Sequence, residues 1–323
     1  MKIAITDYSF SNLDIEEGIL QSQGHEIAAW KEKKTAAELL PLVADADAVI
    51  TQFAPLDANV IANMQKAKVI VRYGIGVDNV DIEAARQRGI PVCNVPDYCI
   101  DEVADQTLAF LLATTRQVVS NAVRNREGKW GLATPLDQMR TLRDMTVGIV
   151  GFGRIGCEVV SRLQAFKCRV LVHDPVVATK EIQQADAEPV ALHDLLSRSD
   201  AISLHCPSMD QTRGMINRDS LAMMKRGAIL VNVARGDLVD SAALTEALQS
   251  GHVTAALDVF APEPIPTGHP ILKLDNAIVA SHIASCSVPA VRKLRETAAN
   301  LAAMALRGDA LPNVMNGVHD SGA

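Results

Sequence analysis

Short apolar runs alternate with amphipathic runs along almost the whole chain. In residues 1–100 the short runs predict buried strands, and the runs between them, apolar on one face only, predict helices. Strands that alternate with helices are typical of a parallel sheet. This part therefore predicts a small α/β domain, with strands at Lys2–Thr6, Ala48–Thr51, Val69–Val71 and Pro91–Cys93 and helices at Ile15–Gln23, Ala36–Ala44, Ala58–Met64 and Ile82–Gln87.

The alternation resumes at Thr146 and predicts a second, larger doubly wound α/β domain over residues 101–289. The last helix, Pro289–Leu306, is predicted to return to the first domain, which then comprises 1–100 and 290–323, and the end of the chain (316–323) is expected to fray. The second domain has predicted strands at Val147–Val150, Arg169–His173, Ala201–Cys206, Ala228–Val233, Val253–Val259 and Ala277–Ala280, and helices at Ile155–Phe166, Leu192–Leu196, Arg218–Met224 and Ser241–Gln249.

One long helical pattern, residues 101–127, joins the two predicted domains. Its apolar positions cover more than one face, so both a domain and a second copy of the chain could pack against it. We predict that this helix crosses between the domains and forms much of a homodimer interface. A helix buried inside the monomer fits the same pattern equally well.

Three glycines follow the strand Val147–Val150 at GxGxxG spacing, and a helical run follows them. Gly151 permits a tight turn, Gly153 leaves room for a pyrophosphate against the backbone, and Gly156 permits close packing of the helix. The N-terminus of that helix then offers free N–H groups and a partial positive charge to phosphates. The alternative is a glycine-rich turn in an unrelated α/β domain.

Asp174 ends the next strand, 18 residues after Gly156. A carboxylate in this place can accept hydrogen bonds from an adenosine ribose. Pro175 follows it, with no arginine there to hold a 2′-phosphate, so the pattern favours NAD over NADP.

Composition and charge narrow the classes of function. A net charge of −7 argues against nucleic acid as a partner, and no apolar run approaches the about 20 residues needed to span a bilayer. The first residues lack the apolar core of a signal peptide, so we expect a cytoplasmic protein. The six cysteines are scattered without a CxxC pair and predict reduced thiols and no metal site.

Side chains with acid/base and anion-binding chemistry follow several strands of the second domain: Arg235, Glu263 and His282. Ligands of parallel sheets bind beyond the carboxyl ends of the strands. A guanidinium can hold a carboxylate by two hydrogen bonds, an imidazole can exchange a proton near neutral pH, and a carboxylate can orient that ring. Together they suit hydride transfer between a nicotinamide and a 2-oxo acid. Singly, each has a structural alternative: a surface arginine, an exposed loop acid and a buried structural histidine.

The segments VGIVGFGRIG, LHCPSMDQTRGMIN, LVNVARGDLVD, AALDVFAPEP and ASHIAS resemble the D-isomer-specific 2-hydroxyacid dehydrogenases in order and spacing. RYGIGVDNVDIEAARQRGIPVCNVP in the first half resembles the substrate-loop segment of the same family. The resemblance implies a homodimer with a Rossmann-type NAD domain and a flavodoxin-like substrate domain. It implies Arg235, Glu263 and His282 as catalytic residues, Asp258 at the nicotinamide, Asp174 at the ribose, Arg154, Ile155, Cys206, Pro207, Thr212, Val233 and Ala234 along the cofactor, and the backbone of Ile75 and Gly76, with Arg235 and His282, at the substrate.

Some positions depart from branches of this family. Phosphoglycerate dehydrogenases of the family have phosphate-binding arginines near Thr51–Phe53, where this chain has none, and no regulatory domain is expected after residue 310. Phosphoglycerate is therefore not the expected substrate. Formate dehydrogenases replace the glutamate that is Glu263 here, and the proline before the catalytic histidine is Ser281.

A second class of function remains open at this point. The segment VCNVPDYCIDEVADQTL resembles the C-terminal-binding-protein corepressors, which keep this fold and bind NAD(H). Those proteins have a tryptophan where this chain has Ser285, and they retain the Arg/Glu/His set. We expect the enzyme, with an NAD(H)-sensing dimeric binding protein as the alternative.

Overall fold

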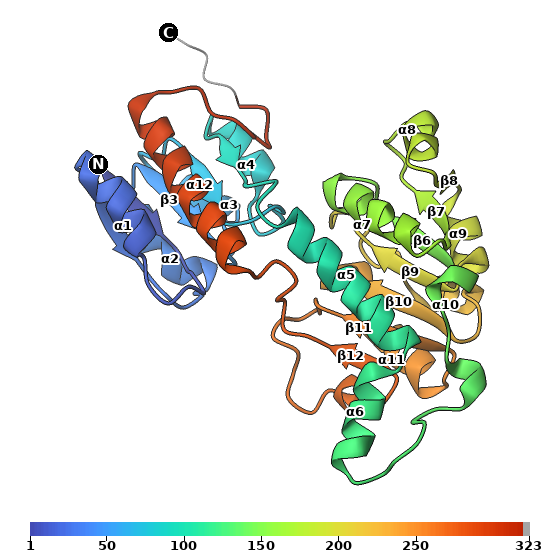
Figure 1. The fold of residues 1–323 in the computed structure, drawn as a ribbon. Coiled ribbons are helices and arrows are strands. Elements are labelled where there is room, and N and C mark those ends of the chain that lie inside the picture. Colours follow the sequence, from blue (N-terminus) through green and yellow to red (C-terminus); the bar gives the residue numbers. More distant parts are fainter. Residues whose placement is uncertain (319–323) are drawn as a thin grey trace. The chain divides into compact units, whose positions relative to one another are not determined.

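The computed structural model describes residues 1–318 of the chain, which form two compact units. One unit comprises Met1–Tyr98 together with the chain from Ser287 onward, and the other comprises Cys99–Cys286. The sequence pattern placed these boundaries after residues 100 and 289. Figure 1 draws both units, which are described separately below.

The first unit is a five-stranded parallel sheet in the order β2-β1-β3-β4-β5. Strand β2 was absent from the sequence prediction because it lies at the sheet edge with its residues exposed or half-buried, so it lacks an apolar run. The strands are β1 (Lys2–Ile5), β2 (Glu26–Ala29), β3 (Ala48–Thr51), β4 (Ile70–Arg72) and β5 (Val92–Cys93), and the helices are α1 (Asp14–Leu20), α2 (Ala36–Val43), α3 (Ala58–Ala62), α4 (Ile82–Gln87) and α12 (Val288–Arg307), with a 3₁₀ turn η1 (Gln21–Gln23).

Helix α12 is the C-terminal helix, and it packs against α1 in the first unit, as Figure 1 shows. Ser287 caps its first turn by accepting from the N–H of Ala290, and Gly308 ends it with a left-handed φ of 80°. A buried ion pair joins the two helices, since Nη2 of Arg295 lies 2.7 Å from Oε2 of Glu16. Both side chains are almost fully excluded from solvent.

The end of the chain is anchored over part of the range expected to fray. The amide of Asn316 donates to the carbonyl oxygen of Ile90 at 2.8 Å and its Oδ1 accepts from the N–H of Val92 at 3.2 Å. That part of the prediction was wrong, because a buried side-chain amide satisfies the edge of β5. Residues 319–323 lie outside the described range.

The second unit is a seven-stranded parallel sheet in the order β12-β11-β10-β9-β6-β7-β8. The strand order reverses between β6 and β9, which places a crevice beyond their carboxyl ends. The strands are β6 (Thr146–Val150), β7 (Arg169–His173), β8 (Glu188–Pro189), β9 (Ala201–Leu204), β10 (Ala228–Asn232), β11 (Val253–Leu257) and β12 (Ala277–Val279). The helices are α5 (Ile100–Thr115), α6 (Val118–Arg126), α7 (Arg154–Ala165), α8 (Thr179–Gln184), α9 (Leu192–Arg198), α10 (Arg218–Met223) and α11 (Ser241–Gln249), with 3₁₀ turns η2 (Leu136–Gln138), η3 (Leu142–Asp144), η4 (Gly236–Leu238) and η5 (Pro270–Lys273).

The single helix predicted over residues 101–127 is two helices, α5 and α6. The hydroxyls of Thr114 and Thr115 donate to carbonyl oxygens one turn back, which weakens the helix, and Gln117 then has a left-handed φ of 53°. Helix α5 buries one face inside its unit, whereas α6 buries no residue. The prediction of one continuous helix was therefore wrong.

Candidate active site

The three glycines after β6 have three different surroundings. A Cβ on Gly151 would lie 2.7 Å from the backbone nitrogen of Cys206, and one on Gly156 would lie 2.1 Å from the carbonyl oxygen of Gly151. Gly153 has no atom within 4 Å of such a Cβ, so the space beside it is open at the N-terminus of α7. Two glycines thus permit close backbone packing and the third leaves room for a phosphate, which fits a dinucleotide. Arg154 and Ile155 are the first residues of α7, exposed and half-buried respectively.

Asp174, at the end of β7, holds the glycine loop in place. Its Oδ2 accepts from the N–H of Phe152 at 2.7 Å, and its Oδ1 accepts from the N–H groups of Val176 and Val177 at 2.8 and 3.0 Å. Burial raises the pKa of this carboxyl, but the three backbone donors outweigh it and hold the pKa below its ordinary value. Each oxygen can accept more than one hydrogen bond, so Asp174 can still accept from a ribose hydroxyl.

The loop after β9 contains Cys206, Pro207 and Thr212. The hydroxyl of Thr212 donates to the carbonyl oxygen of Pro207 at 2.7 Å and accepts from the N–H of Met209 at 2.9 Å, so the loop closes on itself. Burial raises the pKa of the Cys206 thiol to about 11, and this cysteine is a protonated thiol at neutral pH.

His205 directly follows β9 and is a structural residue in its contacts. Its Nε2 lies 2.8 Å from the hydroxyl of Ser203, and burial lowers the pKa of the imidazole to about 3. The ring is therefore neutral at physiological pH, which makes it unsuited to exchange a proton there.

The loop after β10 contains Val233, Ala234 and Arg235. Asn232, the last residue of β10, shapes it: its side chain accepts from the N–H of Ala234 at 3.0 Å and donates to the carbonyl oxygen of Arg235 at 2.7 Å. The guanidinium of Arg235 donates to the carbonyl oxygen of Ala234 at 2.7 Å. Asn232 was not a predicted site residue. The signal in the sequence is an amide within the otherwise apolar predicted strand Ala228–Val233, and the structure shows that this amide is buried.

Glu263 and His282 lie side by side in the structure. Oε2 of Glu263 is 2.8 Å from Nδ1 of His282, and its Oε1 accepts from the N–H of Phe260 at 2.8 Å. Burial raises the pKa of Glu263, but the hydrogen bond and charge of His282, the Phe260 N–H and the charge of Arg235 lower it below its ordinary value overall. The carboxylate is therefore ionised beside the ring, and Arg235 is close enough to influence it.

His282 has a left-handed backbone with a φ of 55°, a conformation that non-glycine residues adopt rarely. Asp258 holds this turn, because its Oδ1 and Oδ2 accept from the N–H groups of Ile283 and Ala284 at 2.9 and 2.8 Å. The N–H of His282 itself donates to the carbonyl oxygen of Asp258 at 2.7 Å. The structure thus gives Asp258 a contact that the sequence did not reveal, namely fixing the loop of the histidine.

Ile75 and Gly76 lie in the first unit, in the loop after β4. Gly74 there has a φ of 148°. The amide of Asn94 donates to the carbonyl oxygen of Ile75 at 2.6 Å. Since the C=O and N–H of a trans peptide point in opposite directions, this bond orients the N–H of Gly76 as well. Asn94 is a second residue that the sequence reasoning missed.

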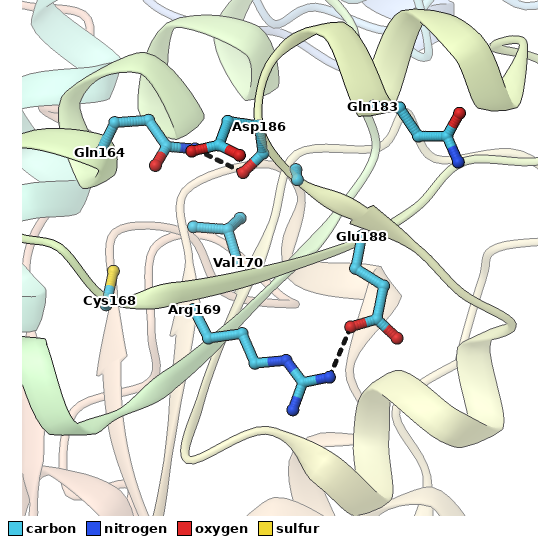
Figure 2. Close-up of a pocket in the computed structure, with 8 residues that line it drawn as sticks. Gln164, Cys168, Arg169, Val170, Gln183, Asp186 and Glu188 are labelled. Atoms are coloured by element: carbon cyan, nitrogen blue, oxygen red, sulfur yellow. Dashed lines mark hydrogen bonds and ion pairs between the residues drawn. The ribbon is translucent and has the colours of Figure 1, made fainter.

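One surface hollow lies away from these residues, at the edge formed by α7, β7 and β8 (Figure 2). Its volume is about 430 Å³, and Figure 2 shows Arg169 paired with Glu188 across it. None of the predicted site residues lines it. Within residues 1–318 there is no group of three or more His, Cys, Asp or Glu that could hold a metal ion, and no helix is long and apolar enough to cross a membrane.

The chain is similar over most of its length to known dehydrogenases and reductases. The family model described as "D-isomer specific 2-hydroxyacid dehydrogenase, NAD binding domain" matches residues 108–284. The D-3-phosphoglycerate dehydrogenase of Mycobacterium leprae (strain TN) is 39% identical over 289 residues, which are 89% of this chain and 54% of that protein. The glyoxylate reductase of Korarchaeum cryptofilum (strain OPF8) is 37% identical over 308 residues, 93% of each chain.

A solved structure, that of the TT0316 protein of Thermus thermophilus, matches with a TM-score of 0.87 at 38% identity, covering 98% of this chain and 100% of that one. This match confirms the predicted fold class, and the match of the NAD-binding domain confirms the predicted cofactor, NAD. The chain spans about half the length of the curated phosphoglycerate dehydrogenases that it matches.

Proposed function

Because the chain belongs to the D-isomer-specific 2-hydroxyacid dehydrogenase family, we propose that it is an NAD-dependent oxidoreductase that interconverts a D-2-hydroxy acid and its 2-oxo acid. The observation that supports this most directly is the 2.8 Å contact between Glu263 and His282, with Arg235 near enough to lower the pKa of the glutamate. All three lie in the unit that contains the open glycine loop.

NAD supplies the hydride acceptor or donor when it is bound. Gly151, Gly153 and Gly156, with the first turn of α7, would hold its pyrophosphate, and Asp174 would accept from its adenosine ribose. The other residues proposed to line the cofactor are Arg154, Ile155, Cys206, Pro207, Thr212, Val233, Ala234 and Asp258.

The proposed roles of the catalytic residues follow from their contacts. His282 exchanges a proton with the oxygen on C2 of the substrate through Nε2, since Nδ1 faces Glu263. Glu263 is ionised and orients the ring through its contact with Nδ1. Arg235 binds the substrate carboxylate and polarises the carbonyl. In the first unit, the backbone N–H groups of Ile75 and Gly76 are the proposed substrate-binding groups.

The proposed substrate is a small 2-hydroxy or 2-oxo acid. Although some relatives are named phosphoglycerate dehydrogenases, we do not propose phosphoglycerate as the substrate. Thr51 is buried, and its hydroxyl contacts the hydroxyl of Thr6 at 2.9 Å. Thr51 is therefore not a cationic ligand for a phosphate, as the sequence already indicated.

We also propose that the protein is a cytoplasmic homodimer. Six large apolar side chains of α6 and the segment after it are exposed in the second unit, from 45% for Val119 to 92% for Trp130. Exposed apolar side chains this close together in the chain favour burial against a second copy. The six are Val118, Val119, Val123, Trp130, Leu132 and Leu136.

The test is NADH oxidation by the purified protein against 2-oxo acids from glyoxylate and hydroxypyruvate through pyruvate to branched, aromatic and sugar-derived acids, with NADPH in parallel. We expect an NADH-dependent rate on some members. His282→Ala and Arg235→Ala should each lose about 100-fold or more in turnover while NADH binding persists. Near-normal turnover in either variant contradicts the site. Tight NADH binding without turnover on any acid would instead favour the NAD(H)-sensing binding protein.

A further inference from the structure

Asp237 lies two residues after Arg235 and contacts the loop after β9. Its Oδ2 accepts from the hydroxyl of Ser208 at 2.6 Å and from Nε of Arg213 at 3.2 Å. Its Oδ1 is buried and has no hydrogen-bond partner within the described residues. A half-exposed acid on a loop ordinarily turns both oxygens to water, so these contacts mark Asp237 as part of an ordered connection.

The backbone joins the same two segments. The N–H of Gly214 donates to the carbonyl oxygen of Asp237 at 2.8 Å, and the N–H of Ile216 donates to that of Leu238 at 3.0 Å. The N–H of Asp240 returns a bond to the carbonyl oxygen of Ile216 at 2.8 Å. The segment after Arg235 is thus a rigid base for the chain that leaves the 207–213 loop.

The side chain of Asp237 contacts the 207–213 loop itself, which the backbone hydrogen bonds do not. Ser208 directly follows Pro207, Arg213 directly follows Thr212, and the 2.7 Å bond between Pro207 and Thr212 closes the loop. Fixing Ser208 and Arg213 from one carboxylate oxygen therefore fixes the ends of that closed loop. Of the hydrogen bonds described between these two segments, those that would remain without the Asp237 side chain all involve backbone groups beyond residue 213, outside the 207–213 loop.

We propose that Asp237 is a positioning residue for the cofactor, which acts by holding the 207–213 loop in the conformation that binds NAD. The inference rests on the proposed cofactor site and extends it to a residue that touches the loop rather than the cofactor. A carboxylate in this place orders the loop before binding, so less conformational entropy is lost when NAD binds.

The experiment measures the Kd of NADH by fluorescence titration of the full chain and the KM for NADH and kcat with the best 2-oxo acid. For Asp237→Ala we expect Kd and KM to rise about fivefold to tenfold, with kcat at saturating NADH within about threefold of wild type. Asp237→Asn can still accept from Ser208 but loses the charge, and it should recover part of the affinity.

Asp210→Asn is the matched control, because Asp210 pairs with the other side of the same guanidinium, Nη1 of Arg213, at 3.0 Å and is 90% exposed. Its Kd should stay within about twofold of wild type. The double variant Ser208→Ala/Asp237→Ala should bind NADH no more weakly than Asp237→Ala alone, because both substitutions remove the same hydrogen bond between Ser208 and Asp237.

Equal Kd values for wild type and Asp237→Ala, or equal increases for Asp237→Ala and Asp210→Asn, would overturn the proposal. Circular dichroism and the Tm of each variant identify a general loss of fold, in which case Asp237→Asn decides. NADH binding by a wild type that turns over no acid would contradict the proposed reaction alone, whereas no NADH binding would contradict the cofactor site and this role together.

Discussion

Replacing Glu263 by Gln tests the proposed catalytic pair with almost no change in shape. Glu263 accepts two hydrogen bonds, from His282 Nδ1 and from the N–H of Phe260, both at 2.8 Å. A Gln amide has one oxygen to accept and one NH₂ that only donates. If the Gln oxygen keeps its bond to the N–H of Phe260, the Gln NH₂ faces Nδ1 of His282. In the protonated ring, the Nδ1–H donor then faces another donor instead of an acceptor. The protonated form of His282 therefore loses its partner.

The size of the effect follows from the strength and exposure of this bond. A hydrogen bond to a charged group contributes about 1.5–3 kcal/mol when it is well shielded. The side chains of His282 and Glu263 are 29% and 34% exposed, so we take the lower half of that range, about 1.5–2 kcal/mol. Since 1.36 kcal/mol in the activation barrier corresponds to a factor of ten, kcat for reduction should fall about 10- to 30-fold.

The assay is steady-state oxidation of NADH with the best 2-oxo acid, together with a fluorescence titration of NADH. NADH affinity should stay within about twofold, because Glu263 is not proposed to contact the cofactor. Glu246→Gln is the control, as its carboxylate pairs with Arg218 on the surface of the same unit. A Glu263→Gln variant with the turnover of Glu246→Gln would refute the reasoning that the carboxylate supports the charged ring.

Three further outcomes are expected. Asp174→Ala should reduce the preference for NADH over NADPH about tenfold in kcat/KM, and an unchanged ratio would show that Asp174 does not contact the ribose. The folded-state pKa of Asp174 lies below its ordinary value, so its contribution to stability is present above about pH 4 and is lost as the pH falls through the lowered pKa; urea unfolding of Asp174→Asn between pH 6 and 3 should depend less on pH than that of wild type. Glu16→Gln leaves the buried Arg295 without its buried ionised partner, with only the exposed Asp14 still paired to it, and should destabilise the first unit by about 3–5 kcal/mol in urea unfolding, whereas Asp14→Asn, which removes an exposed carboxylate at 3.1 Å from the same guanidinium, should cost about 0.5 kcal/mol or less. Equal losses of unfolding free energy in Glu16→Gln and Asp14→Asn would contradict the reasoning that burial determines the contribution of each carboxylate.

The elements that the sequence predicted well are those with a strong local pattern. Central strands such as β9 and β10 are buried on both faces and appear as continuous apolar runs. The edge strands β2 and β8 are short and half-exposed, so they lack that pattern and were missed. Their pairing depends on a neighbouring strand that is distant in sequence, or on backbone hydrogen bonds that the side-chain pattern does not predict.

The break between α5 and α6 has a different cause. The apolar and polar positions of residues 101–127 continue a helical period through Gln117, so the pattern alone predicts one helix. The backbone reverses locally at Gln117, where a φ of 53° is adopted by a residue type without a strong preference for it. The amide of Gln117 donates to the carbonyl oxygen of Thr114, and this contact exists only in the folded turn.

The sequence by itself determined the family, the glycine loop and the candidate residues Arg235, Glu263 and His282, because residue identity at strand ends specifies chemistry and the topology of a parallel sheet brings strand ends to one edge. Only the tertiary structure decided how those residues are held. In it, both oxygens of Asp258 bind the turn of His282, and Glu263 orients the ring of His282. Hydrogen bonds of this kind join segments that are distant in the chain, and their geometry follows from backbone conformations that have no periodic signature in the sequence.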